Sequence, residues 1–144
     1  MKQVVLTTDL EVPAAKLWQE FSQIENYPRY VKFMSHAEVL GPFQVGTTWV
    51  DTTNILIFPQ RINHEITEVL ENKKICFSVE LPLKGEMRQS FLLEERGGGT
   101  KVTARIDFDL KNPIVSLLLD SFLQRRLEDM LASTLESFKQ KVLL

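Results

Sequence analysis

The sequence predicts a single α+β domain in which a curved antiparallel sheet grips one long C-terminal helix. Residues 113–144 carry apolar side chains at three- and four-residue steps, the spacing that covers one face of an α-helix. Residues 2–110 instead contain a series of segments in which apolar and polar side chains alternate, as they do along strands that are buried on one side. With 144 residues, the chain suits one domain with a substantial core.

The first strand is expected at residues 2–12, where apolar and polar side chains alternate. Pro13 follows at a place that a first helical turn tolerates, and Leu17 and Phe21 continue at helical spacing as far as Ser22. This pattern predicts a short helix directly after the strand.

A second short helical turn is expected close behind the first. Pro28 interrupts the first pattern, because the residue before a proline avoids the helical region. Tyr30, Val31 and Phe33 then form another short apolar turn. The two short helices should form a bent pair.

Five or six further strands are expected between Ser35 and Leu110, separated by turn residues. Tight turns between consecutive strands predict antiparallel pairing. Residues 75–81 and 102–110 show the alternation most clearly, with one apolar face throughout. The glycines at 97–99 predict a hairpin turn, because a phosphate-binding loop would be followed by a helix and here a strand follows.

The composition argues against several classes of protein. The 17 basic and 19 acidic residues give a net charge of −2, and no basic block could hold a phosphate backbone, so we expect no nucleic-acid partner. Cys76 is the single cysteine, which excludes an intrachain disulfide or a two-cysteine metal motif, and we expect an inert thiol. His36 and His64 lack metal-ligand spacing, so neither a metal nor a cofactor is expected.

The N-terminus lacks the continuous apolar run of a signal peptide. No stretch of the sequence reaches the length of apolar residues that a membrane span needs. We therefore expect a cytoplasmic protein without stable membrane insertion.

Four parts of the sequence carry a family resemblance. They are LEVPAAKLW at 10–18, IENYPRYV at 24–31, VGTTW at 45–49 with ITEV at 66–69, and GGGTKVT at 97–103. Together they resemble the START-like (SRPBCC) superfamily, also called the Bet v 1-like or polyketide cyclase/dehydrase group, over nearly the whole chain. The resemblance implies one domain, residues 1–144, with a helix-grip fold: a seven-stranded antiparallel sheet around the long C-terminal helix, and two short helices after strand one.

The same resemblance implies a cavity between sheet and helix for an apolar ligand such as a lipid, sterol, polyketide or quinone tail. The superfamily includes enzymes, carriers and co-chaperones, so the fold does not choose among these functions.

His64 shares the apolar side of residues 62–66, so its imidazole should face the interior. There it could act as a general base or hydrogen-bond a ligand carbonyl. The alternative is a buried or rim histidine without chemistry. His36 is a weaker candidate.

Asp51 should share one face of its strand with Trp49 and Thr53. A buried carboxylate must be paired, so Asp51 is expected near an open end or beside a cation such as Arg61 or Arg88. A register slip of one residue would instead place it outside. Asp51 and His64 are the two candidate catalytic residues.

Gln89 lies in period two with Met87 and Phe91, so its amide could orient the polar end of a ligand. The alternative is a glutamine at the sheet edge bonded to backbone or water. The candidate ligand-binding residues are those expected on the inner faces: Trp49, His64, Phe77, Gln89, Phe91, Ile106, Phe108, Leu119, Phe122 and Leu123.

The long helix is apolar nearly all round over its first turns, 114–119. The extra apolar face needs a second cover, which could be the lip of the cavity, a dimer contact or a weak membrane-touching patch. A cavity lip combined with a homodimer contact is the preferred interpretation.

The leading functional hypothesis is a carrier, with little or no enzymatic activity, for a small hydrophobic molecule of lipid, polyketide or quinone type. The second is a polyketide cyclase or dehydratase that uses His64 or Asp51 as a non-covalent acid or base, and inward clustering of two ionisable groups would favour it. The third is a co-chaperone-like protein-interaction module, which predicts a filled core. A fourth resembles quinone-binding members of respiratory chains. Covalent catalysis is not expected, because no nucleophile motif is present.

Overall fold

The structure is a computed structural model that describes residues 2–54 and 58–143. Its helices and strands follow the chain in this order: β1 (Lys2–Leu10), α1 (Ala14–Phe21), η1 (Ile24–Arg29), β2 (Met34–Val39), β3 (Thr48–Thr53), β4 (Gln60–Leu70), β5 (Lys74–Glu80), η2 (Pro82–Lys84), β6 (Glu86–Arg96), β7 (Gly99–Asp109) and α2 (Pro113–Leu143).

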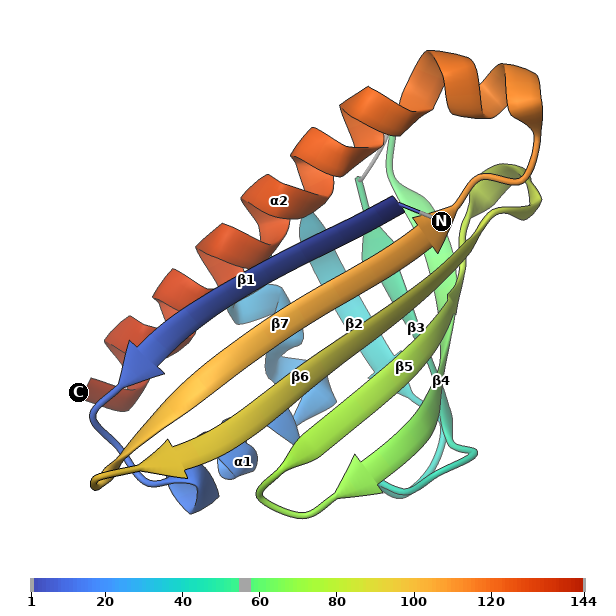
Figure 1. The fold of residues 1–144 in the computed structure, drawn as a ribbon. Helices are drawn as coiled ribbons and strands as arrows, with labels where there is room; N and C mark the ends of the chain where they lie inside the picture. Colours follow the sequence, from blue (N-terminus) through green and yellow to red (C-terminus); the bar gives the residue numbers. More distant parts are fainter. Residues whose placement is uncertain (1, 55–57, 144) are drawn as a thin grey trace.

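The strands of the described residues form one seven-stranded antiparallel sheet in the order β1-β7-β6-β5-β4-β3-β2. β2 to β7 therefore pair in sequence order, and β1 joins the sheet beside the last strand. Figure 1 shows the sheet curving around the interior, with α2 running alongside β1 and α1 near the C-terminal end of α2. The predicted α+β helix-grip fold is confirmed.

The second short helical segment begins earlier than expected. It is a 3₁₀ helix, η1, that includes Pro28. The Tyr30 N–H donates to the Tyr27 carbonyl at 2.9 Å, so Pro28 occupies the second position of a turn. Its fixed φ suits that position and no backbone donor is needed there. The expected break at Pro28 is therefore wrong, because η1 continues through it. The expected bent pair of short helices is present.

The predicted hairpin at the three glycines joins β6 to β7. Gly97 and Gly98 adopt φ values of +56° and +88°, which few other residues tolerate. Gly99 has a different reason to be glycine, because a Cβ there would lie 2.8 Å from the carbonyl oxygen of Leu10. The turn thus brings β7 close to the end of β1.

The C-terminal part of α2 closes the interior. Its buried side chains recur at three- and four-residue steps: Leu123, Leu127, Met130, Leu131, Thr134, Leu135 and Phe138. The Phe138 ring stacks on Phe21 of α1 at 4.4 Å and on Tyr30 at 4.5 Å between ring centroids. α1 and α2 are therefore joined by a compact aromatic cluster.

The start of α2 is held by its cap and by Val115 and Leu119, which are partly buried against the core. The Asn112 side-chain oxygen accepts hydrogen bonds from the backbone N–H groups of Ile114 and Val115, at 2.9 and 3.2 Å. Large apolar side chains on these first turns are exposed: Ile114, Leu117, Leu118 and Phe122. Within the described part of the chain, no helix is both long enough and apolar enough to cross a membrane.

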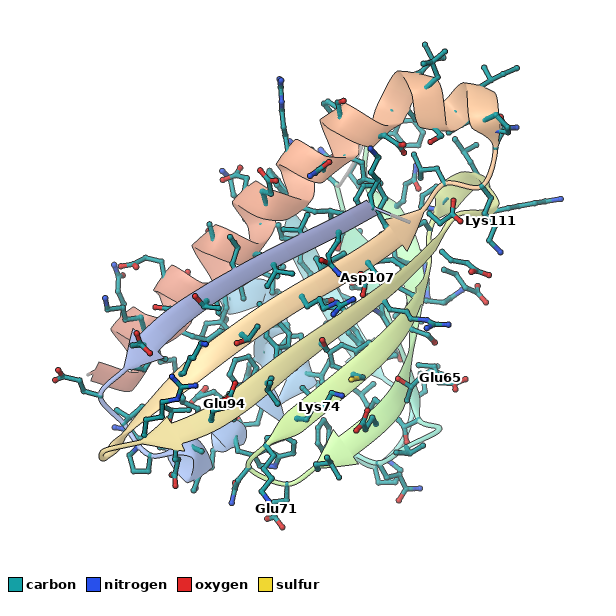
Figure 2. The ribbon with its side chains drawn as sticks, viewed as in Figure 1. Glu65, Glu71, Lys74, Glu94, Asp107 and Lys111 are labelled. Atoms are coloured by element: carbon teal, nitrogen blue, oxygen red, sulfur yellow. The ribbon has the colours of Figure 1, made fainter. Side chains whose placement is uncertain are left out.

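The outer face of the sheet is polar, as Figure 2 shows with the side chains of Glu65, Lys74, Glu94 and Asp107. Arg105 lies 2.9 Å from Asp107, and this hydrogen-bonded guanidinium holds the pKa of Asp107 below its usual range. Because one face of each strand is polar and the other buried, the register of the sheet is well specified.

Candidate functional site

β3 and β4 bring the two predicted ionisable residues together. In their antiparallel register, Trp49 lies opposite His64 and Asp51 lies opposite Ile62. Asp51 and His64 are thus diagonal neighbours on the same face of the sheet, a separation that side chains can bridge. Both are buried, and both point to the interior side that sequence alternation predicted.

The buried pair is close. His64 Nε2 lies 2.6 Å from Asp51 Oδ2, and the side chains are only 4% and 3% exposed. Thr53 donates its hydroxyl to the other carboxylate oxygen, Oδ1, at 2.7 Å. Sequence reasoning expected a cation such as Arg61 or Arg88 beside Asp51, but both arginines are exposed and His64 takes that place. The hydrogen-bonding partner of Asp51 is therefore supplied by the adjacent strand.

An aromatic wall supports the imidazole. The Trp49 ring lies parallel to His64, with 3.6 Å between centroids and 8° between planes. Phe77 and Tyr27 meet Trp49 edge-on at 5.3 and 5.7 Å. These packed rings leave His64 little freedom to rotate, so its hydrogen-bond directions are fixed.

Two nitrogen atoms in this wall have no partner. Trp49 Nε1 and His64 Nδ1 are both buried, and neither has a hydrogen bond to any described residue. Leaving a buried polar atom unpaired costs about 1–3 kcal/mol, so such atoms call for a ligand or ordered water.

Asp51, His64 and Trp49 border a small cavity of about 40 Å³ between the sheet and α2. This volume holds about three water molecules. The remaining lining is mostly apolar: Tyr27, Val31, Met34, Thr53, Ile62, Leu81, Met87, Gln89, Phe91, Leu127, Met130, Thr134 and Phe138. Three of these side chains are methionines, whose flexible, unbranched chains can move to admit a larger molecule.

The predicted ligand-binding residues fall into two groups. Trp49, His64, Gln89 and Phe91 line the cavity, as does the catalytic candidate Asp51. The others lie outside its lining: Phe77 packs against Trp49, Ile106, Phe108 and Leu123 are buried in the core, Leu119 is half-buried and Phe122 is exposed. Contact of any of these residues with a ligand stays a prediction.

Sequence reasoning missed the helical wall of the cavity. Leu127, Met130, Thr134 and Phe138 all border it from α2. Their spacing of three and four residues was visible in the sequence. However, the apolar stripe continues along the whole helix and did not mark which turns face the cavity.

The remaining reactive groups are less well placed for chemistry. The Tyr27 hydroxyl donates to the Phe21 carbonyl, and burial raises its pKa, so it remains a neutral donor. Cys76 is half-buried on the opposite side of β5 from Phe77, and burial raises its pKa too, which disfavours the reactive thiolate.

His36, the weaker histidine candidate, is exposed. The described residues contain no cluster of three or more His, Cys, Asp or Glu that could hold a metal.

Comparisons with known proteins agree with this architecture. A family model described as polyketide cyclase/dehydrase and lipid transport matches residues 1–143. No curated protein matches the sequence.

Several solved structures share the fold. TTHA0849 from Thermus thermophilus is 19% identical with a TM-score of 0.82, and the alignment covers 99% of this chain and 97% of that one. A START superfamily protein from Mycobacterium smegmatis is 14% identical with a TM-score of 0.79, covering 97% and 96%. Norcoclaurine synthase from Thalictrum flavum is 15% identical with a TM-score of 0.77, covering 99% and 86%. At these identities, the likeness shows the fold alone.

Proposed function

The chain belongs to the polyketide cyclase/dehydrase and lipid transport family, and from this premise we propose that it binds a small hydrophobic molecule in the cavity between the sheet and α2. The observation that carries the proposal is the cavity itself, whose lining is mostly apolar and includes the buried Asp51–His64 cluster and a few further polar side chains such as Gln89. Ligand pockets commonly combine an apolar lining with a few polar groups that fix orientation.

The apolar lining would supply affinity, and the polar cluster would supply orientation. Burying apolar surface stabilises a complex by about 25 cal/mol per Å². The present cavity is too small for a long chain or a fused ring system. We infer that Met34, Met87 and Met130 change rotamer when such a ligand enters, because methionine does so at low cost.

An acid–base enzyme is the second candidate, and one observation favours it. Two ionisable groups cluster inward, since His64 and Asp51 meet at 2.6 Å within the lining. With Nε2 bound to the carboxylate, His64 Nδ1 could take a proton from a bound carbonyl compound and return it. Asp51 would stabilise the imidazolium that forms. Such proton transfer is the step that a cyclase or dehydratase needs.

A co-chaperone-like interaction module receives less support, because it predicts a filled core and a cavity is present. Norcoclaurine synthase is a structural neighbour with enzymatic activity, although only the fold is shared. A cytoplasmic location, and a homodimer built on the exposed start of α2, remain predictions.

Native mass spectrometry of gently purified protein, followed by solvent extraction, tests ligand binding. We expect an apolar passenger at one copy per chain, or uptake of an added apolar compound by emptied protein. Protein that carries nothing and takes up nothing would contradict the proposal.

Deuterium exchange tests the enzymatic candidate. Acetophenone in D₂O should exchange its methyl protons faster with the unmodified protein than with His64→Gln, as followed by proton NMR. Equal exchange rates would remove the enzymatic candidate and leave ligand binding intact.

A further inference from the structure

The two unpartnered nitrogens in the cavity wall limit what the polar end of a ligand can be. Trp49 Nε1 and His64 Nδ1 belong to parallel rings whose centroids are 3.6 Å apart. Both residues border the cavity. A single ligand oxygen beside this stacked pair could come within hydrogen-bond reach of both nitrogens.

The hydrogen-bond roles of these atoms follow from their neighbours. The Asp51 carboxylate already accepts from Thr53, and its second oxygen faces His64 Nε2. Because a carboxylate only accepts, Nε2 carries the hydrogen, and Nδ1 of the neutral ring is an acceptor. An indole nitrogen always donates. The wall thus offers one donor and one acceptor.

We propose that this wall selects a hydroxyl group on an uncharged, apolar molecule such as a phenol or an enol. The hydroxyl oxygen accepts from Trp49 Nε1, and its hydrogen is donated to His64 Nδ1. A ketone has no hydrogen for Nδ1, and a carboxylate would add a second negative charge beside buried Asp51. This assignment rests on the proposed function and adds the chemical class of the ligand.

The contacts of Asp51 fix the hydrogen-bonding role of His64. Thr53 and His64 hold Asp51 at both of its oxygens, so the carboxylate keeps the imidazole in the tautomer that accepts at Nδ1. Trp49 and His64 therefore act as specificity-determining residues, and Asp51 and Thr53 as positioning residues.

Calorimetry with three matched probes tests the assignment. The probes are 4-ethylphenol, 4-ethyltoluene and 4-ethylbenzoate, which share an apolar body and differ in one substituent. We expect the phenol to bind about tenfold more tightly than the toluene, as two added hydrogen bonds allow, and the benzoate to bind most weakly. Trp49→Phe keeps an aromatic ring beside His64 but removes the donor, so it should lower the ratio of phenol affinity to toluene affinity.

Phe91→Leu is the matched control, because it alters only apolar lining. It should weaken the phenol and the toluene by the same factor. In the unmodified protein, nitrogen NMR gives an independent readout: the His64 Nδ1 resonance should shift on adding 4-ethylphenol but not 4-ethyltoluene. This measurement keeps the test valid if Trp49→Phe fails to fold.

The outcomes separate this inference from the function on which it rests. If none of the three probes binds, ligand binding itself is contradicted and the inference falls with it. If the toluene binds as tightly as the phenol, or the benzoate binds best, the cavity binds ligands but the hydroxyl assignment is overturned.

Discussion

Two neighbouring regions of the interior differ in how closely they are packed and in how many of their polar atoms have hydrogen-bond partners. Around Phe21, two further aromatic rings fill the space, with centroids 4.4 Å away at Phe138 and 4.8 Å away at Phe91. Around His64, a buried hydrogen-bonded Asp51–His64 pair, two unpartnered nitrogens and a cavity of about 40 Å³ lie together. The same sheet and helix build both regions.

The comparison indicates that the region around Phe21 stabilises the fold, whereas the region around His64 lowers its stability. Close packing of apolar rings stabilises the fold directly. A buried carboxylate contributes little net stability even when it is hydrogen-bonded, and unpaired polar atoms reduce stability. The region around His64 is therefore a poor choice for stability alone, and its side chains are better explained by binding.

Phe21→Ala should have the largest effect. Phe21 is 1% exposed, and removing its ring leaves a cavity beside Phe91 and Phe138. We expect the free energy of unfolding to fall by about 4 kcal/mol, measured by urea denaturation. Phe122→Ala, at a residue that is 42% exposed, is the control and should cost far less. Similar losses for both variants would contradict the contrast between filled and exposed positions.

Removing one member of the Asp51–His64 pair should have the next largest effect. Asp51→Val leaves His64 Nε2 and the Thr53 hydroxyl without their shared partner. We expect a loss of about 3 kcal/mol in unfolding free energy.

The double variant Asp51→Val with His64→Leu also removes the imidazole left unpaired by the single variant, so it should be more stable than that variant. If the losses of the two single variants simply add, Asp51 and His64 do not form the coupled pair that we describe.

Two threonines in the cavity lining allow a sharper comparison. Thr53 donates to the carboxylate of Asp51, so Thr53→Val leaves a buried charged oxygen with one fewer donor. We expect a loss of about 1.5 kcal/mol, read from thermal and denaturant unfolding. A change close to zero would indicate that Asp51 does not depend on Thr53.

Thr134→Val should have the smallest effect. The Thr134 hydroxyl donates at 2.7 Å to the Met130 carbonyl, within its own helix. That carbonyl lies one helical turn earlier, where the backbone already supplies a donor. We expect a change within about 0.5 kcal/mol by the same unfolding measurement. A loss as large as that of Thr53→Val would show that the two hydroxyls are equivalent.

Much of the fold was predictable because its signals are local. Alternation along each strand marked the buried face, and it correctly placed Trp49, Asp51 and His64 inside. Turn residues separated the strands, and the three glycines marked the last hairpin. Pro28 was misleading, because proline suits the second position of a turn as well as the end of a helix.

The pairing of Asp51 with His64 was not predictable in the same way. It depends on the register between β3 and β4, and the connection between these strands, residues 54–59, is longer than the two-residue loops that fix the register of a hairpin. The cavity was similarly hidden, because α2 is apolar along its length. The predicted contacts at Leu119, Phe122 and Leu123 lie N-terminal to the turns that line it.

The methionines around the cavity can be oxidised, and their oxidation should depend on whether the cavity holds a ligand. Oxidation converts a methionine thioether to a polar sulfoxide, which would put a strong dipole into an apolar wall. Met34, Met87 and Met130 all border the cavity, so a molecule seated there would stand between them and an incoming peroxide. We therefore expect these three methionines to be oxidised more slowly when the cavity is occupied. Once oxidised, they would weaken the binding of hydrophobic molecules.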